Sequence, residues 1–269
     1  MRAAAALLLG TLALVVPVDA RVAAAPANVQ SAYEATQPAA TARNAVIGRR
    51  VLGRTTQGRP IRAWHLGDPQ ARWTVVAVGA MHGNEQQSLR PLRHLRDHRP
   101  VQGVDLWVVP VMNPDGLRSD SRKNARGVDL NRNFPVSWRD LDGDYESGPR
   151  PASEPETRAM MRFLRSVDPD RVISLHQPFF AVDAKDSKRP RWSRRVAREM
   201  RIPLANVDCN GKCHGTMTQW FNRRLAGASI TVELAAVSSR HYLSAVAPNG
   251  LLRSVDGQRG RRSSPADGR

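Results

Sequence analysis

Residues 73–85 read WTVVAVGAMHGNE, and this stretch decides the fold. Its first part, 73–80, is a nearly continuous apolar run, which is typical of a strand buried on both faces of a sheet. His82 and Glu85 follow where that strand ends, and both side chains can reach one metal ion when the chain turns into a helix between them. Such an H-x-x-E pair alone is a weak signal, because it often occurs by chance on solvated loops.

Three further apolar runs predict strands, at 106–111, 172–175 and 230–232, and Pro110 favours an edge or irregular position for the first of them. Apolar residues at helical spacing predict helices near Leu89, after a capping box at 153–156, and around Trp192 and Met217. Alternating strands and helices predict a three-layer α/β/α domain with a mixed, largely parallel sheet over residues 45–251.

The two ends of the chain differ from this middle part. Residues 1–25 have the layout of a secretory signal peptide, with cleavage after Ala20 or near Ala25. The apolar run at 3–18 is shorter than the ~20 residues that span a bilayer. We therefore expect no transmembrane anchor after cleavage, and a secreted, periplasmic or cell-wall-associated protein. Residues 26–44 predict a flexible linker and 252–269 a disordered tail.

The chain is strongly basic, with 41 Lys and Arg against 24 Asp and Glu and a formal net charge of +17. Only four of the basic residues are lysines. A GC-rich coding sequence explains so much arginine, and an anionic partner such as a cell-wall surface explains it as well. Nucleic acid is not expected as a partner, because the basic residues are not interleaved with aromatics and no binding motif is present.

The two cysteines fit the exported compartment that the signal peptide predicts. Cys209 and Cys213 bracket the pair Asn210-Gly211, whose tight turn can bring the two Cα atoms within the ~7 Å that a disulfide needs. Their spacing is not C-x-x-C, and no larger Cys/His cluster surrounds them, so a redox or metal role is not favoured. We expect a disulfide between them.

Two more polar residues follow predicted strands, namely His176 in LHQP at 175–178 and Glu233 in TVEL at 231–234. A lone histidine or glutamate on a core strand is usually a satisfied structural residue. Here polar positions stand at the ends of three separate strands, and sites in open α/β sheets gather at the carboxyl ends of strands. This common placement favours one shared site.

The most specific segment is RKNARGVDLNRNFP at 122–135. Together with the other motifs it resembles the M14 zinc carboxypeptidases, the carboxypeptidase A-like family. The matching pieces occur in family order across roughly residues 45–250: HGNE at 82–85, NPDG at 113–116, GVDLNRNFP at 127–135, SEPET at 153–157, LH at 175–176 and the glutamate of TVEL. The chain looks most similar to the bacterial murein-peptide amidase branch, which cleaves the bond between γ-D-glutamate and diaminopimelate.

The resemblance implies one zinc ion per chain. His82, Glu85 and His176 match the family's zinc ligands, and Asp129 matches a carboxylate that orients the imidazole of His82. Two histidines and one carboxylate leave the fourth zinc position open, as a catalytic site requires.

The resemblance also assigns the catalytic and substrate-binding roles. Glu233 matches the general base, and Arg122 matches the arginine that stabilises the oxyanion. Asn131 and Arg132 match the pair that grips the terminal carboxylate of a peptide substrate. These roles imply a secreted metallocarboxypeptidase or amidase that acts on a C-terminal amide bond, with murein stem peptides as the expected substrates.

One departure and two alternatives remain. Digestive members carry a substrate-capping tyrosine between the second zinc histidine and the catalytic glutamate, and this chain has none between His176 and Glu233. An acyl-amino-acid deacylase of the aspartoacylase or succinylglutamate desuccinylase type also has HGNE and a DLNR stretch. A non-catalytic wall-binding protein is the third hypothesis, although it predicts the loss of a ligand or of the base.

Overall fold

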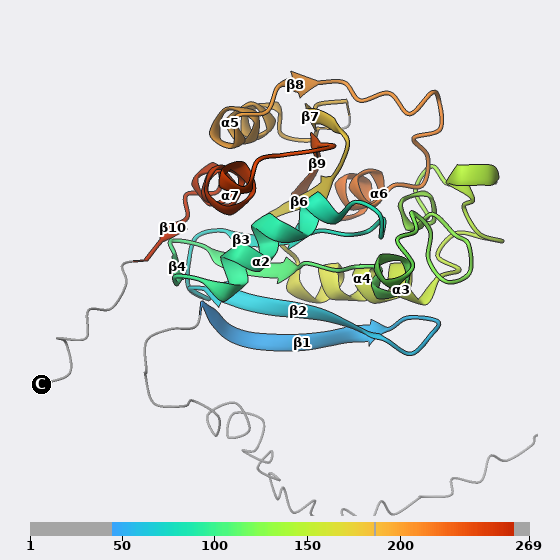
Figure 1. Cartoon of the computed structure of the whole chain (residues 1–269), viewed down its shortest axis with the longest axis horizontal. Helices are drawn as coiled ribbons and strands as arrows, with labels where there is room; N and C mark the ends of the chain where they lie inside the picture. Colours follow the sequence, from blue (N-terminus) through green and yellow to red (C-terminus); the bar gives the residue numbers. More distant parts are fainter. Residues whose placement is uncertain (1–44, 186, 261–269) are drawn as a thin grey trace, which may run out of the picture. The chain divides into compact units, whose positions relative to one another are not determined.

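The structure is a computed structural model that describes residues 45–185 and 187–260, so the predicted signal peptide and linker lie outside the described residues. Eight strands form one sheet in the order β1-β2-β5-β3-β6-β9-β7-β8, with β1 and β8 at its two edges (Figure 1). The four inner strands β5, β3, β6 and β9 run parallel to one another. Antiparallel pairs join β1 to β2, β2 to β5 and β7 to β9, and β8 runs parallel to β7. The prediction of a mixed, largely parallel sheet is confirmed.

The ten strands among the described residues form one large sheet and one separate pair. The strands of the large sheet are β1 (Val46–Arg54), β2 (Pro60–Gly67), β3 (Thr74–Val78), β5 (Asp105–Val109), β6 (Arg171–His176), β7 (Phe179–Asp183), β8 (Leu204–Ala205) and β9 (Ala228–Ala235). A separate pair consists of β4 (Val101–Gln102) and β10 (Gln258–Arg259).

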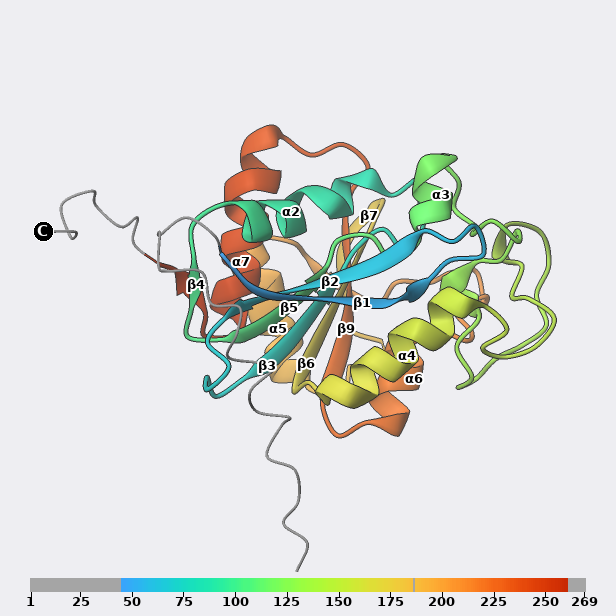
Figure 2. The ribbon, with the colours of Figure 1, turned by 90° about the horizontal axis from the view of Figure 1, so that it is seen from below.

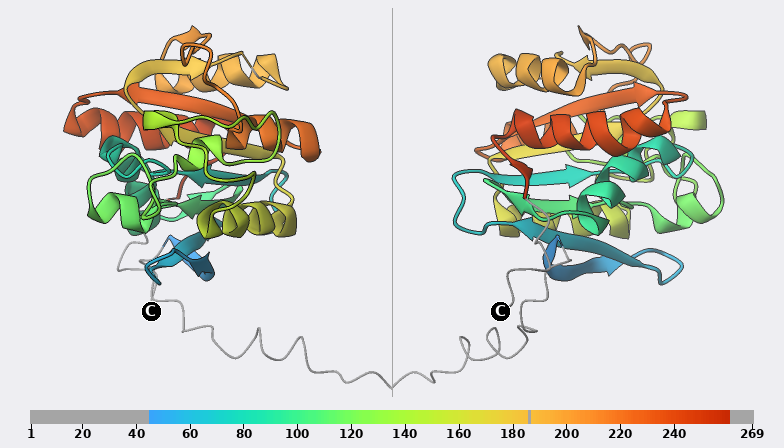
Figure 3. Two further views of the ribbon diagram at one scale, coloured as in Figure 1. Left: turned by 90° about the vertical axis from the view of Figure 1, so that its right-hand side faces the viewer. Right: turned by 60° about the vertical axis from the view of Figure 1, so that its left-hand side comes forward.

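Helices cover both faces of the sheet and complete the three predicted layers (Figure 2). One face packs against α2 (Leu89–Asp97), α5 (Pro190–Met200) and α7 (Ala247–Ser254), and Figure 3 shows α7, in red, lying across it. The other face packs against α4 (Pro155–Val167) and α6 (Met217–Arg224). No helix among the described residues combines the length and apolarity that a bilayer span needs.

Alternation along β3 explains why its sequence has no polar gap. Val75 and Ala77 belong to the core under α2, α5 and α7, whereas Val76 and Val78 belong to the core under α4 and α6. Because successive side chains of a strand point to opposite faces, a strand covered on both sides must be apolar throughout.

The remaining helical segments are short and lie in the connections. They are η1 (Gln86–Ser88), α3 (Pro114–Arg118), η2 (Leu130–Arg132), η3 (Gly143–Tyr145) and the π-helical turn η4 (Tyr242–Val246) before α7.

The expectation drawn from Pro110 is wrong. β5 lies inside the sheet between β2 and β3, and it ends at Val109, one residue before the proline. A proline removes a ladder hydrogen bond only when it lies within the strand, so one that follows the last paired residue does not force an edge position.

The predicted capping box at the start of α4 is wrong as well. The residue that caps α4 is Glu154, and no side chain caps its first turn, although Pro155 stands at the tolerated first position. The hydroxyl of Ser153 instead donates to the carboxylate of Glu154 at 2.7 Å, and Asn124 donates to both Glu154 and Glu156. The SEPE segment therefore anchors the loop that begins at residue 122, because its carboxylates accept from that loop.

The predicted tail begins too early. Residues 252–254 complete α7, and residues 258–259 form β10, so the boundary at 252 is wrong, while 261–269 lie outside the described residues. Long-range contacts order this segment: Asp256 accepts from the indole of Trp73 at 2.9 Å, and Arg259 donates to the backbone oxygen of Leu95 at 3.0 Å. The polar composition of this segment gave no sign of these contacts, because their partners lie far away along the chain.

His94 on α2 predicts a loss of stability on acidification. The pKa of His94 is lowered to about 4, chiefly by burial and further by the charges of His98, Arg259 and Arg99, while Asp97 opposes them. The folded protein therefore keeps this imidazole neutral between pH 6.5 and 4, where the unfolded chain takes up a proton. Between pH 6.5 and 4 the wild-type protein therefore loses free energy of unfolding through His94. We expect His94→Gln to reduce this loss by about 1 kcal/mol, a figure lowered to allow for screening of this partly exposed side chain by solvent.

Urea denaturation of wild type and His94→Gln at pH 7.5 and pH 4.5 measures this effect. The variant should lose less free energy of unfolding on acidification than wild type does. Parallel losses in the two proteins would assign the acid sensitivity to other groups.

Candidate active site

The carboxyl ends of three parallel strands bring the predicted chemistry together. His82 and Glu85 follow β3, and His176 is the last residue of β6. Glu233 lies on β9 directly opposite His176 in the strand register. All four side chains are buried, with exposed fractions between 2% and 7%. The predicted convergence of separate strand ends is therefore what the fold contains.

Three side chains form a compact donor set. The Nδ1 atom of His82 lies 2.6 Å from Oε1 of Glu85, and the Nδ1 atom of His176 lies 2.9 Å from Oε2 of the same carboxylate. The two Nδ1 atoms are 3.3 Å apart, and one ligand atom from each of the three residues lies within 4.8 Å of the others. Two imidazole nitrogens and one carboxylate suit zinc and leave a coordination position open for catalysis.

The other nitrogen of each imidazole is already engaged. The Nε2 atom of His82 pairs with Oδ1 of Asp129 at 2.9 Å, and the Nε2 atom of His176 pairs with the hydroxyl of Ser174 at 2.9 Å. Each ring thereby presents Nδ1 to the centre, and such partners fix the orientation of a metal ligand. Sequence reasoning found Asp129 but missed Ser174, although its position two residues before His176 on one strand places both on the same face.

The charges show that the centre attracts a cation. Burial lowers the pKa of His82, but the carboxylates of Glu85 and Asp129 outweigh burial and raise it to about 9. Burial raises the pKa of each carboxyl group, yet His82 brings both well below their usual range. Two buried acids thus require positive charge between them, which a proton or a divalent ion can supply.

Glu233 stands beside this centre without a role in the donor set. Its side chain is 7% exposed, and its Oε2 atom has no hydrogen-bond partner among the described residues. Burial raises the pKa of Glu233, and the nearby charge of Glu85 adds to the increase, while His176 opposes it. A buried carboxyl group with an unpartnered oxygen and a raised pKa suits proton transfer.

Arg122 reaches the centre from the loop after α3. Its Nε and Nη2 atoms donate to Oδ2 of Asp129 at 3.0 and 2.8 Å. Its Nη1 atom then lies 3.4 Å from Nδ1 of His82 and 3.5 Å from Oε1 of Glu85. Asp129 therefore orients both an imidazole and a guanidinium, one through each oxygen.

Asn131 and Arg132 belong to η2, directly after Asp129. The side-chain oxygen of Asn131 accepts from the backbone N–H of Met217 at 3.0 Å, which ties η2 to the start of α6. Arg132 is 3% exposed and donates through Nη1 to the backbone oxygen of Asn131 at 2.8 Å. Its Nε atom has no hydrogen-bond partner among the described residues. A buried guanidinium with an unused donor suits an incoming carboxylate.

A cavity of about 240 Å³ joins these groups. Its lining includes all the predicted catalytic, ligand and carboxylate-binding residues, with Asp129 behind them. It also includes residues that sequence reasoning missed: Tyr145, Gln177, Phe179, Asp183, Thr216, Thr218 and Thr231. Tyr145, Gln177 and Thr216 lie in connections whose course no periodic pattern predicts, whereas the other four stand on β7, α6 and β9. Thr231 could have been found, because it precedes Glu233 by two positions on β9 and shares its face.

The predicted disulfide is present and borders this cavity. Cys209 and Cys213 are bonded, with their Cα atoms 5.3 Å apart. Asn210 and Gly211 both have positive φ, at 53° and 71°, and the N–H of Lys212 donates to the oxygen of Cys209 at 3.0 Å. This is the tight turn that the Asn-Gly pair favours.

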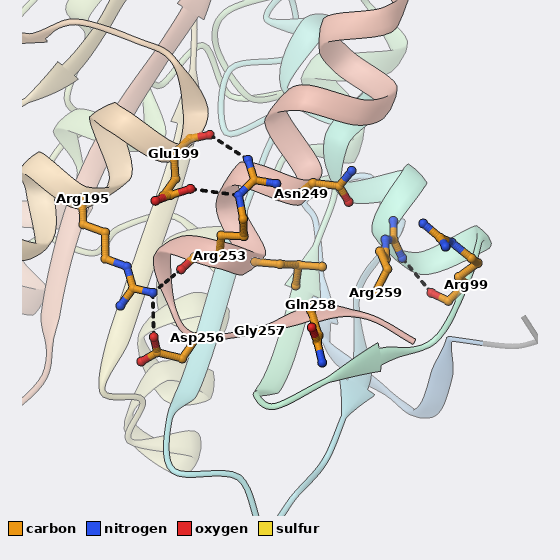
Figure 4. A pocket seen from close by; sticks show the side chains of 10 residues that line it. Arg99, Arg195, Glu199, Asn249, Arg253, Asp256, Gly257, Gln258 and Arg259 are labelled. Atoms are coloured by element: carbon orange, nitrogen blue, oxygen red, sulfur yellow. Dashed lines mark hydrogen bonds and ion pairs between the residues drawn. The ribbon is translucent and has the colours of Figure 1, made fainter. Parts of the chain in front are cut away.

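A larger hollow of about 430 Å³ lies around the end of α7 and β10, and three of its arginines, Arg195, Arg253 and Arg259, are engaged in structural contacts (Figure 4). Arg253 pairs with Glu199 at 2.8 Å, and Arg195 pairs with Asp256 at 2.6 Å. Arg259 donates to three backbone oxygens at and after the end of α2. None of the three groups proposed as metal ligands lines this hollow, so we place the chemistry in the smaller cavity.

Comparisons with known proteins find relatives over most of the described chain. The family model for zinc carboxypeptidase matches residues 39–179. Murein peptide amidase A of Escherichia coli (strain K12) is 30% identical over 233 residues, which cover 77% of this chain and 90% of the relative. Murein peptide amidase A of Vibrio campbellii is 28% identical over 179 residues, with 61% and 70% covered.

Solved structures show the same fold. The murein-tripeptide amidase of Escherichia coli O157 superposes with a TM-score of 0.64 at 27% identity, over 81% of this chain and 94% of that one. The carboxypeptidase A of Helicoverpa armigera superposes with a TM-score of 0.60 at 17% identity, over 79% and 66%, a likeness of fold alone.

Proposed function

The chain belongs to the zinc carboxypeptidase family and is a hydrolase, and from this premise we propose that it is a zinc-dependent amidase acting on cell-wall peptides. One observation carries the proposal. A buried donor set of His82, Glu85 and His176 shares its cavity with Oε2 of Glu233 and Nε of Arg132, two atoms that have no hydrogen-bond partner in the described part of the chain. Metal ligands, a proton acceptor and a carboxylate receptor thus meet in one place.

The roles of the side chains follow from their positions. When bound by His82, Glu85 and His176, zinc supplies Lewis acidity toward water and toward the scissile carbonyl. Glu233 takes the proton of the attacking water and later passes it to the leaving amine. Arg122 donates hydrogen bonds to the oxyanion that develops on the carbonyl, an effect of roughly 3–4 kcal/mol per donor in other hydrolases.

Arg132 and Asn131 set the position of the substrate. The free Nε of Arg132 and the amide nitrogen of Asn131 bind the carboxylate that ends the peptide, so that the last amide bond lies at the catalytic groups. An internal peptide bond offers no such charge at this point. The enzyme therefore removes a terminal residue rather than cutting within a chain.

Murein stem peptides fit this chain as substrates for two reasons. Relatives with 28–30% identity carry the name murein peptide amidase A, and such stem peptides bear several carboxylates that suit a protein with a net charge of +17. We propose diaminopimelate as the residue released.

Export to the cell wall is part of the same proposal. The segment at 1–25 has the order of a signal peptide, and the bond between Cys209 and Cys213 is typical of exported proteins. The enzyme would then meet murein outside the reducing cytoplasm.

A substrate panel tests the proposal. The zinc-loaded protein should release diaminopimelate from a murein tripeptide, and amidation of its terminal carboxylate should slow the reaction by about 100-fold because the charge-assisted bond to Arg132 is lost. Arg132→Gln should raise KM for the free acid by a similar factor and leave the amidated tripeptide unchanged. Mass spectrometry and initial rates give both readouts.

Three results would reject it. Release of ordinary C-terminal residues without diaminopimelate would indicate a general carboxypeptidase. Activity confined to N-acyl aspartate or glutamate would indicate a deacylase. Salt-dependent binding to walls without any hydrolysis would indicate a binding protein.

A further inference from the structure

We propose that Tyr145 is a positioning residue whose ring holds the guanidinium groups of Arg122 and Arg132 toward the cavity. This inference rests on the proposed function, because the two arginines have the oxyanion and carboxylate roles assigned above. Tyr145 ends η3, far upstream of the segment between His176 and Glu233 that lacks a tyrosine.

The contacts that support the proposal converge on one ring. The guanidinium carbon of Arg122 lies 5.4 Å from the centroid of the Tyr145 ring, and that of Arg132 lies 4.9 Å from it. The ammonium of Lys212, on the disulfide loop, lies 5.3 Å from the same centroid. Cations at these distances are attracted by the negative face of an aromatic ring.

The two arginines need such a shared partner. Burial lowers the pKa of Arg132, the negative charge of Asp129 opposes this effect, and the positive charge of Arg122 lowers the pKa further, so the two guanidiniums repel each other in a poorly hydrated place. Asp129 forms hydrogen bonds to Arg122 but not to Arg132. The ring of Tyr145 lies within cation–π distance of both guanidiniums, and it attracts them without neutralising the charge that the substrate needs.

The hydroxyl of Tyr145 takes no part in holding the described fold together. The ring is partly exposed at the cavity, and no hydrogen bond joins its hydroxyl to the described residues. Removing the hydroxyl alone therefore breaks no hydrogen bond within the described part of the chain. Replacing the ring by an aliphatic side chain removes the attraction to both arginines while it keeps apolar volume.

Paired variants separate the ring from the hydroxyl. Tyr145→Leu should lower kcat about threefold through Arg122 and raise KM about threefold through Arg132, so that kcat/KM for the murein tripeptide falls about 10-fold. Tyr145→Phe keeps the ring and should stay within threefold of wild type in kcat/KM. Tyr242→Phe is the matched control, because the hydroxyl of Tyr242 donates to the backbone oxygen of Met200 outside the cavity. This variant should leave kcat and KM unchanged.

A binding measurement and crystal structures extend the test. Isothermal titration of free diaminopimelate should show about threefold weaker binding to Tyr145→Leu than to wild type or Tyr145→Phe. Crystal structures should show Arg122 and Arg132 displaced in Tyr145→Leu and unmoved in Tyr145→Phe, whichever substrate the enzyme prefers. Equal thermal midpoints will show that both variants fold.

Two outcomes would overturn the proposal. Wild-type constants and unmoved arginines in Tyr145→Leu would show that the ring does not position them. An equal loss in Tyr145→Phe and Tyr145→Leu would transfer the role to the hydroxyl. Failure of wild type to cleave the tripeptide would instead reject the proposed function, while the crystal structures would still decide the role of Tyr145.

Discussion

Glu233→Gln is expected to lower kcat for the murein tripeptide by roughly 10²- to 10⁴-fold, the range that general acid–base groups contribute. The amide has the shape of the carboxylate but cannot take up the proton of the attacking water. Because Oε2 of Glu233 has no hydrogen-bond partner among the described residues, the change breaks no contact there that would unfold the site. Single-turnover and steady-state rates measure the loss.

A matched control separates proton transfer from the mere loss of a buried acid. Glu156 is also buried, its Oε1 atom has no hydrogen-bond partner within residues 45–185 and 187–260, and its pKa is raised chiefly by burial, but it does not line the cavity. Glu156→Gln should keep kcat within about threefold of wild type, and Glu233→Gln should keep its zinc. A Glu233→Gln enzyme with more than a tenth of wild-type kcat would remove this residue from the role of base.

His176→Ala is expected to abolish zinc binding at concentrations that saturate wild type, and hydrolysis with it. Its Nδ1 atom is one of the three converging donors, and its loss leaves two ligands. Asp129→Asn keeps all three donors and should weaken zinc only about 10–100-fold, since it alters the partner of His82 rather than a ligand.

Thermal unfolding gives a readout of zinc binding that is independent of hydrolysis. Zinc at 100 times its dissociation constant should stabilise wild type by about 2.7 kcal/mol, and a chelator should reverse the gain. His176→Ala should show no shift with either reagent, and metal analysis should agree. If neither zinc nor the chelator changed the thermal unfolding midpoint of the wild-type protein, this result would contradict the proposed metal centre.

The general plan of the fold was predictable because its signals are local. The apolar run at 73–80 predicts a strand covered on both faces from its own residues alone. The strand β3 lies within this run, as predicted. The predictions were wrong where the structure of a segment depends on residues far away along the chain. Residues 252–260 look polar along the chain, yet contacts from Trp73 and to Leu95 order them.

The candidate site divides in the same way. His82, Glu85, His176 and Glu233 could be found because each stands next to a predicted strand end, and parallel strands bring such ends to one edge of the sheet. Tyr145 could not be found, because it lies in an irregular connection between η2 and α4. Nothing near it in the chain indicates that its ring meets two arginines.

The sequence by itself determined the kind of domain, the family motifs and the residues able to bind a metal or move a proton, since these depend on residue type and short spacing. Only the tertiary structure decided which imidazole nitrogen faces the centre, that Ser174 orients His176, and which ring the arginines share. The physical reason is that hydrogen bonds and cation–π contacts act over a few ångströms between segments far apart along the chain. Their partners are chosen by packing, which no short stretch of sequence contains.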